Sequence, residues 1–506
     1  MGKIERKENT QISVDGLKPA PYPIQRCANQ VADARQLPGM WPHLNFWPGS
    51  VETMASAVAA APALKRVLSR GDLILYGLVL LTPTAAYPVF GIVQQTSQGH
   101  AALSYLVAMV AMLFTAASYG KMSGAFPSAG STYTYAQMAL SPNVGFIAGW
   151  AMILDYFLIP LLSVVYAALT ASRMLPQVPY AAWAILFTVM ITAINVRGIR
   201  VTARAGNVMM VLMTVCAVVF VVLSARWVIA HHGIQGLFAL HGLYIPETFA
   251  VRPLMLGAAI ASLSYIGFDA ISTLAEDTIR PERDISIATV LVCLIQTVFC
   301  VVTAYLAALV WPDFRTYPNS ETAILDIGRV AGGAWMMGFL IFILLVAGLA
   351  SALTGQAGAS RLLLGMGRDG VISRRIFAHI DPRFSTPVRG IYLMGMVSLI
   401  GSLVMRFQLV VELLNFGAFI GFILVNLSVI RHFYFRLRQR AGYAVFSNLL
   451  FPLAGTLVCT YVWLNLSLKA HVAGFCWLGV GIAYLAVITR GFRVEARTLQ
   501  SFSTLD

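Results

Sequence analysis

The sequence predicts an all-α membrane protein with twelve transmembrane helices, and three observations support that prediction. Hydrophobic residues make up 58% of the 506-residue chain and charged residues only 11%, whereas a soluble domain carries about 25% charged residues. The apolar residues fall into twelve runs that are each long enough to cross a bilayer. The basic residues lie mostly on one side of the topology that these runs produce.

A transmembrane helix needs about 20 predominantly apolar residues, because each residue advances the helix by about 1.5 Å. The third and eighth runs are longer than one crossing requires, which indicates tilt or an included loop. The predicted spans are residues 72–97, 102–124, 142–172, 179–196, 205–230, 253–276, 286–311, 334–364, 388–405, 409–430, 445–466 and 471–489.

The distribution of Lys and Arg predicts that both chain termini are cytoplasmic. With that orientation the outer loops hold few of the 35 basic residues, namely Arg173, Arg226, Arg252, Arg315, Arg329, Arg406 and Lys469. The net charge of +14 therefore follows from the positive-inside rule and from contact with anionic membrane lipid. It gives no reason to expect a nucleic-acid partner.

Three segments follow from this topology. Residues 1–70 are largely polar, contain no apolar core of membrane-spanning length and do not resemble a cleavable signal peptide. They are predicted to form a mobile cytoplasmic tail. Residues 71–489 form the transmembrane domain, and residues 490–506 form a second cytoplasmic tail.

The first and sixth spans each contain an expected helix break. Pro83, Pro88 and Gly91 interrupt the first span in mid-membrane, where a break must line a cavity or be covered by protein. The sixth span has a second candidate break at residues 264–267. If spans 1–5 and 6–10 are two repeats, the breaks occupy matching positions, which is typical of an inverted-repeat transporter with its site at the midplane. Spans 11 and 12 are then peripheral.

Several motifs resemble one family. They lie after spans 2 and 8 and within spans 6 and 10. The motif after span 2 is Phe126 to Tyr135, and the one after span 8 is Arg361 to Gly370. Span 6 and the loop after it contain Gly267-Phe268-Asp269 with Glu276, Pro281 and Arg283, and span 10 contains Asn415 to Ala418 and Val425 to Ser428. Together they resemble the amino acid/polyamine/organocation permease superfamily. Residues 70–490 are most similar to its bacterial putrescine importers, including Phe90 to Val93, Ser118 to Lys121 and Leu154 to Tyr156.

The resemblance implies a leucine-transporter-like fold and a permease of the inner membrane. It implies import of putrescine or a related polyamine by alternating access, with spans 1, 3, 6, 8 and 10 lining the site. An amino-acid permease of the same superfamily is the alternative transport function. A membrane ligand sensor with the same fold is the alternative from another class, and measured flux would separate it from a transporter.

The residues of the first break favour an amine over an amino acid. Relatives that carry amino acids usually have a Gly-Ser-Gly type break, whose free amides hold the substrate carboxylate. This chain has one glycine there, Gly91, beside the aromatic Tyr87 and Phe90. An ammonium gains about 0.5 to 2 kcal/mol from each aromatic face that it contacts. The candidate aromatic contacts are Tyr87, Phe90, Tyr265, Phe268 and Phe416, each of which is alternatively a core-packing residue.

Few acids fall within the spans, so few residues are candidate amine ligands. A carboxylate at the centre of a membrane helix costs roughly 2.5 to 3.5 kcal/mol and is normally functional. Asp269 follows the span-6 break, where the resemblance places substrate or proton recognition; alternatively it only holds helices together. Glu276, about 10.5 Å further along the helix, is a second proton-coupling candidate or the partner of a loop arginine. Asp155 either takes a second amine or anchors span 3.

No sequence motif points to an enzyme or to a bound cofactor. His231, His232 and His241 lie in one outer loop at a loose spacing, which is more typical of solvated loop histidines than of a metal site. Proton coupling through Asp269 is an expectation. Ser and Thr hydroxyls with free carbonyls near Ser351 and the span-1 break are candidates to hold Na⁺; alternatively these hydroxyls serve ordinary helix packing.

Overall fold

The computed structural model describes residues 67–127, 131–197, 203–275, 278–368, 373–381, 383–384, 386–489 and 491. Every regular element among these residues is a helix, and the β-type pairings there are two isolated bridges, Leu68 with Thr278 and Asp381 with Thr386. The predicted all-α class is therefore confirmed. Most of the two predicted tails lies outside the described residues.

The helices follow the predicted order of two five-span repeats and two further spans. The first repeat contains α3 (Arg70–Leu81), α4 (Phe90–Thr96), α5 (Ala101–Ala125), α6 (Ser131–Ala139), α7 (Pro142–Met174), α8 (Tyr180–Val196) and α9 (Ala203–Gly236). The second contains α10 (Val251–Ala261), η2 (Ser262–Tyr265), η3 (Phe268–Leu274), α11 (Pro281–Val310), α12 (Ala323–Arg368), α14 (Val388–Val404) and α15 (Phe407–Val429). The last two spans are α17 (Phe451–Leu464) and α18 (Leu468–Ile488).

Short helices connect these spans. They are η1 (Leu240–Gly242), η4 (Phe314–Thr316), α13 (Arg374–Phe377), η5 (Ile430–Arg436), α16 (Tyr443–Val445) and η6 (Phe446–Leu450). The helix α6, which begins within the motif after span 2, was not among the predicted spans and is too short to cross a membrane.

The twelve predicted spans are present in the described part of the chain. Nine segments there are long and apolar enough to cross a membrane, and α8 and α14 are shorter apolar helices of 17 residues each. The first span consists of two short helices, α3 and α4, which are separated by residues 82–89. Neither half is long enough to cross alone.

Glycines explain the two longest helices. α12 has 46 residues, but Gly333 inside it has a left-handed φ of 74°, a conformation that costs glycine little. The helix that crosses the membrane thus begins next to residue 334, where the eighth span was predicted to begin. Gly233, with φ 69°, interrupts α9 in the same way, so the residues before each glycine and after it form separate helices.

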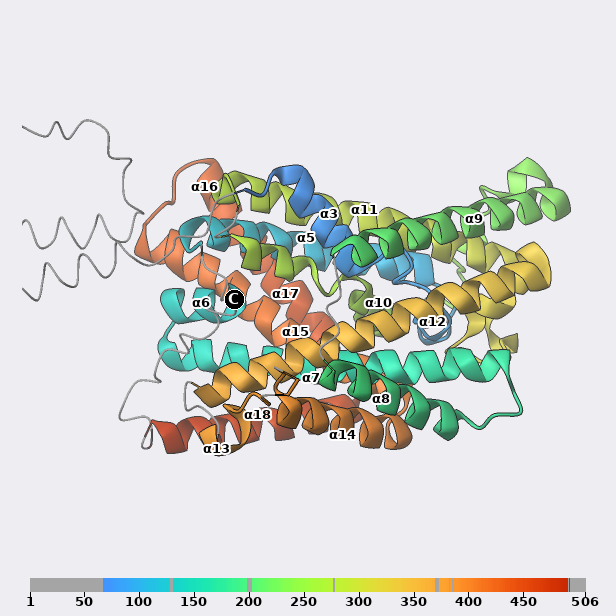
Figure 1. Cartoon of the computed structure of the whole chain (residues 1–506). Helices are drawn as coiled ribbons and strands as arrows, with labels where there is room; N and C mark the ends of the chain where they lie inside the picture. Colours follow the sequence, from blue (N-terminus) through green and yellow to red (C-terminus); the bar gives the residue numbers. More distant parts are fainter. Residues whose placement is uncertain are drawn as a thin grey trace, which may run out of the picture. The chain divides into compact units, whose positions relative to one another are not determined.

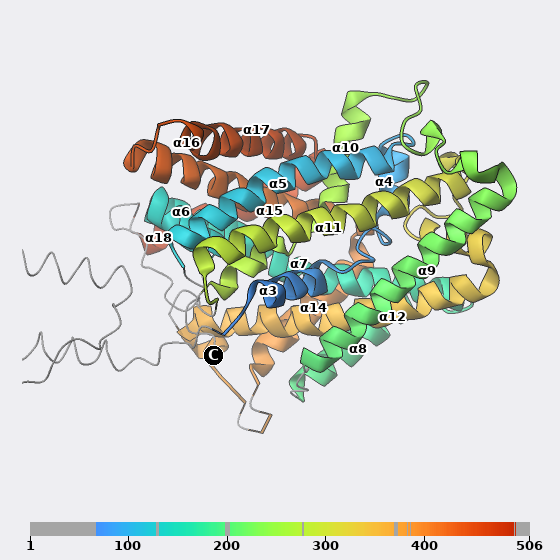
Figure 2. The same cartoon turned by 90° about the horizontal axis from the view of Figure 1, so that it is seen from above.

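Most long helices run along a common direction, with α7 in their midst (Figure 1). α7 packs against α6, α8, α12, α14 and α15, and α5 packs closely against α11. Figure 2 shows α16 and α17 at one edge of this bundle and α8 and α9 at another. We call the end of the bundle at which α3 begins the Arg70 end, and the end at which α4 stops the Thr96 end.

Candidate functional site

The first break is held open by side chains that satisfy its freed carbonyl groups. Pro83 and Pro88 have no N–H to donate, so the helical hydrogen-bond ladder cannot continue through residues 82–89. Gln296 Nε2 donates to the Thr82 carbonyl at 3.0 Å, and Ser264 Oγ donates to the Ala85 carbonyl at 3.1 Å. Because unsatisfied backbone groups in a membrane are costly, these donors stabilise the break.

The second break lies directly against the first. It runs from Ser262 to Gly267, and Gly267 has a φ of 121°, which L side chains rarely adopt. Ser264, the donor to the first break, is part of it. A Cβ added to Gly267 would lie 3.6 Å from Leu80 Cβ at the end of α3. The two interrupted spans therefore meet at their breaks, as the matching repeat positions predict.

Asp269 stands just after the second break and is half-buried. Its Oδ1 accepts a hydrogen bond from the Gly267 backbone N–H at 3.2 Å. Its backbone carbonyl accepts from Ser272 Oγ at 2.6 Å, and Ser272 Oγ lies 2.9 Å from Ser131 Oγ of α6. The described residues give this carboxylate no Lys, Arg or His partner within 4 Å, so backbone donors hold it in place without neutralising it.

Aromatic residues lie near this carboxylate. Phe268 is fully buried, with its ring centroid 5.5 Å from that of Tyr119 and 5.3 Å from that of Phe422. The hydroxyl groups of four tyrosines lie within electrostatic range of Asp269, and they come from α3, α5, α6 and α7: Tyr76, Tyr119, Tyr135 and Tyr156. Rings of this kind, next to a carboxylate, suit a cation that has lost its water.

Asp155 on α7 is the second acid of the site. It is only 4% exposed, and its Oδ1 has no hydrogen-bond partner among the described residues. It lies within electrostatic range of Asp269. A buried polar atom without a partner costs about 1 to 3 kcal/mol, and more when it is charged. Tyr119, which packs against Phe268, lies within electrostatic range of both acids, and Asp155 keeps an unused acceptor atom.

Gly417 of α15 explains how closely α15 approaches this acid. A Cβ added at Gly417 would lie 2.6 Å from the Ala151 carbonyl oxygen and 3.3 Å from Asp155 Oδ1. The approach is possible only because Gly417 has no side chain. This glycine belongs to the span-10 motif that the sequence analysis used only as a family signature.

Interior side chains near the breaks are accessible, which indicates an opening into the bundle. Leu80, next to Gly267, is 41% exposed, and Tyr156 on the enclosed helix α7 is 43% exposed. On α12, Ser351 is exposed and receives a hydrogen bond from Ser163 of α7. It lies nine residues, about two and a half turns, from the outward-facing Phe342. Its exposed side therefore faces the interior.

The other half of the first span is closed by packing. Phe90 and Gly91 are buried, and the Phe90 ring lies 6.4 Å from that of Tyr317. A Cβ at Gly91 would lie 2.2 Å from the Ser320 carbonyl oxygen. Tyr87 is buried against Phe220, with its hydroxyl unpartnered among the described residues. The opening is therefore on the Arg70 side of the breaks, and the Thr96 side is packed.

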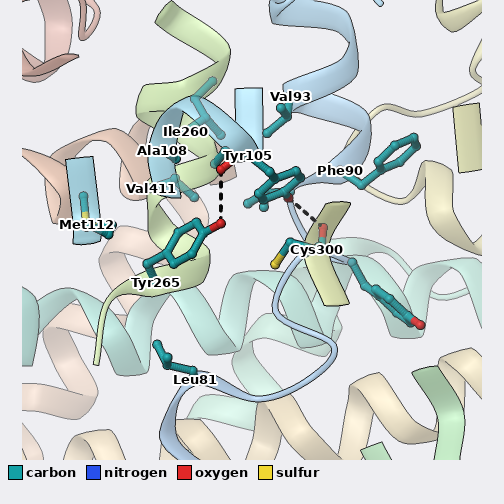
Figure 3. Packing of buried hydrophobic residues seen from close by; sticks show 14 of the residues in the cluster. Leu81, Phe90, Val93, Tyr105, Ala108, Met112, Ile260, Tyr265, Cys300 and Val411 are labelled. Atoms are coloured by element: carbon teal, nitrogen blue, oxygen red, sulfur yellow. Dashed lines mark hydrogen bonds between the residues drawn. The ribbon is translucent and has the colours of Figure 1, made fainter. Parts of the chain in front are cut away.

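Two further predicted residues are placed away from Asp269. Tyr265 is fully buried, and its hydroxyl donates to the Tyr105 carbonyl at 3.1 Å (Figure 3). Phe416 packs against Trp463, His471 and Phe475 of the last two spans. These contacts assign Phe416 to the packing of α15 against α17 and α18. Whether either ring contacts a substrate stays a prediction.

Some predicted residues lie outside the described set, and some functional candidates were missed. Glu276 is not among the described residues. Tyr76, Tyr119 and Tyr135 are not among the predicted amine contacts, although Tyr119 and Tyr135 belong to the family motifs. Their spacing from the breaks along the chain gives no signal, because they approach Asp269 only through packing of α3, α5 and α6.

The histidines predicted to lie in an outer loop lie on helices instead, because α9 continues past residue 230: His231 and His232 belong to α9 and His241 to η1. His231 stacks on Trp227 with ring centroids 4.2 Å apart, and its Nδ1 lies 2.8 Å from the Trp227 carbonyl oxygen. The described residues contain no group of three His, Cys, Asp or Glu side chains suited to a metal ion.

Comparison with known proteins matches most of the chain. The family model described as "Amino acid permease" matches residues 88–487. The low-affinity putrescine importer PlaP of Escherichia coli (strain K12) is 35% identical over 434 residues, which cover 85% of this chain and 95% of that protein. The branched-chain amino acid permease BcaP of Bacillus subtilis (strain 168) is 26% identical over 88% of this chain and 97% of that protein.

A solved structure supports the fold independently. The crystal structure of MhsT in complex with L-phenylalanine superposes with a TM-score of 0.56 at 16% sequence identity, covering 80% of this chain and all of that chain. At this identity the likeness bears on the fold alone. It confirms the leucine-transporter-like arrangement of two five-helix repeats.

Proposed function

The chain belongs to the amino acid permease family, which makes it a multi-pass inner-membrane transporter and not an enzyme, and from that premise we propose that it imports putrescine or a related polyamine. The observation that carries the proposal is a pair of acids: Asp269, which accepts from the Gly267 backbone N–H, and Asp155, whose buried Oδ1 has no partner among the described residues. Two carboxylates without a basic partner match two ammonium groups. The similarity to a putrescine importer supports the same class of substrate.

The first break also favours an amine over an amino acid. Its backbone N–H groups are largely engaged, because those of Ala85, Tyr87, Val89 and Phe90 donate to carbonyls at most four residues back. Pro83 and Pro88 have none. An α-carboxylate would need such amides free, so an amino-acid permease remains the second candidate, supported mainly by the similarity to BcaP.

The proposed orientation places the open side of the structure in the cytoplasm. With the Arg70 end in the cytoplasm, the accessible side chains near the breaks face inward and the packed Thr96 side faces outward. We propose that the structure resembles the state that releases substrate into the cell. A dication that enters down a potential of roughly 100 mV gains about 4.6 kcal/mol, so accumulation is possible without an ion partner.

Proton coupling is proposed through Asp269, with Glu276 as the second candidate. A carboxylate that has released its ammonium ligand in a dry site regains stability by taking up a proton. A measurement of uptake with and without an inward proton gradient, at constant potential, tests this. Uptake that does not respond to the gradient would leave the membrane potential as the driving force.

The direct test is uptake of labelled putrescine into proteoliposomes under a negative-inside potential, for the parent and for Asp269→Asn. We expect saturable uptake that spermidine competes and neutral amino acids do not, and a fall of at least about 100-fold in the variant, equivalent to about 2.7 kcal/mol. Normal uptake by the variant, or stronger competition from neutral amino acids, would contradict the amine site. Binding without flux would indicate a sensor.

A further inference from the structure

A second, separate cleft lies at the Thr96 end of the bundle. It has a volume of about 320 Å³, within the range of about 300 to 1,000 Å³ typical of small-molecule pockets. Its walls come from the end of α4, from α10, from the start of α15 and from the loop between α17 and α18. None of the residues around Asp269 lines it.

One wall of this cleft carries a buried acid. Glu412 is 5% exposed, its Oε1 accepts from Gln408 Nε2 at 2.9 Å, and its Oε2 accepts from the Ser467 backbone N–H at 3.3 Å. No Lys, Arg or His lies within 4 Å of it among the described residues. A buried carboxylate held by two neutral donors still favours a cation.

The opposite charge is supplied by Arg252 at the start of α10. Arg252 lines the same cleft, is exposed and has no ion-pair partner among the described residues. The rest of the lining has six aliphatic and four polar residues. The aliphatic ones are Leu256, Ala259, Ile260, Leu464, Leu466 and Leu468, and the polar ones are Thr96, Gln408, Asn465 and Ser467. The cleft thus joins one positive group, one negative group and an apolar surface.

We propose that this cleft binds a zwitterion, whose ammonium group meets Glu412 and whose anionic group meets Arg252. A diamine satisfies Glu412 but is repelled by Arg252, so the cleft and the central site select different ligands. Two sources share this chemistry: a free aliphatic amino acid, and the ethanolamine phosphate headgroup of a phospholipid. The aliphatic lining suits the side chain of the first or the chain end of the second.

A structural path connects the cleft to the central site. Asn415 lies one turn beyond Glu412 on α15 and donates from Nδ2 to the Ala259 carbonyl at 2.6 Å. Ala259 lines the cleft and precedes the second break by three residues. A ligand between α10 and α15 therefore touches the half-helix that leads into the break. Occupancy of the cleft is expected to change the maximum rate of putrescine uptake without competing for the central site.

The test is equilibrium binding of labelled L-leucine to the full chain in nanodiscs of phosphatidylglycerol alone, whose headgroup carries no ammonium group. We expect one saturable site that putrescine does not displace. Glu412→Gln and Arg252→Gln should each weaken it at least about tenfold. Asp269→Asn should bind normally, and so should the matched control Lys469→Gln, which removes an exposed charge next to the cleft.

A parallel arm tests the lipid source. Native mass spectrometry in the presence of phosphatidylethanolamine should show an adduct that Glu412→Gln and Arg252→Gln lose, if the headgroup is the occupant. Leu468→Trp, at a residue 79% exposed in the structure, should block either ligand by filling the cleft without removing a charge. Absence of both leucine binding and the lipid adduct, or binding that Asp269→Asn alone removes, would overturn the proposal.

Discussion

The two helix breaks occupy matching positions in the repeats but supply different chemistry. The first, between α3 and α4, carries two prolines and no charge, and donors from neighbouring elements satisfy its freed carbonyls. The second carries Gly267 in a left-handed conformation and, two residues later, Asp269. The first break therefore contributes uncharged surface to the site and the second contributes a carboxylate. The two repeats share an architecture but differ in what their breaks do.

Backbone substitutions should distinguish the breaks most strongly. Gly267→Ala places a Cβ on a residue with φ 121°, which costs about 1 to 3 kcal/mol and displaces the amide that holds Asp269. We expect putrescine uptake to fall at least about tenfold, measured in proteoliposomes. The matched variant is Thr82→Gly in the first break, where φ is 56°, and it should transport normally. Equal losses in both variants would mean that the breaks are equivalent.

A smaller effect is expected from the hydrogen bond that joins the breaks. Ser264→Ala removes the donor to the Ala85 carbonyl and should cost about 0.5 to 1.5 kcal/mol, with a three- to tenfold loss of uptake. Ser262→Ala is the matched control, because its hydroxyl bonds within its own helix to the Ala258 carbonyl. Equal putrescine uptake by the Ser264→Ala and Ser262→Ala variants would show that the contact between the breaks is not used in transport.

The smallest effect concerns the beginning of the first span. Arg70 donates to Asp284 Oδ1 from Nη2 at 2.8 Å, and Arg280 Nε lies 3.5 Å from Oδ2. Because Arg70 is partly exposed and Arg280 remains, Arg70→Gln should lower the free energy of unfolding by less than about 1 kcal/mol. Thermal unfolding should show the difference at low salt and lose much of it in 1 M salt. If the stability difference between the parent and Arg70→Gln did not change with salt, it would come from packing and not from the ion pair.

The sequence predicts most of the fold because membrane insertion leaves few choices. Apolar runs gave the twelve spans, and Pro83, Pro88 and Gly267 marked both breaks. α6 was missed because a nine-residue helix has no membrane-length signal. Gly333, in contrast, divides the 46-residue helix at the point where the eighth span was predicted to begin.

The site was predictable only in part. Asp269 and Asp155 stand out as rare acids within apolar spans, and the structure brings them together. The tyrosines around Asp269 and the packing of Phe416 depend on which helix faces neighbour each other, and one sequence does not contain that information. Glu412 lies near the end of its span, and its burial depends on the distant loop that carries Ser467.

The central claim is that Asp155 and Asp269 hold the two ends of a diamine, and a comparison of putrescine with n-butylamine tests it most directly. In the parent, competition should favour putrescine by at least about tenfold, because n-butylamine leaves one carboxylate without an ammonium partner. In Asp155→Asn, putrescine should weaken while n-butylamine binds as well as before or better, so that the preference disappears. A preference for putrescine that survives in Asp155→Asn would contradict the claim.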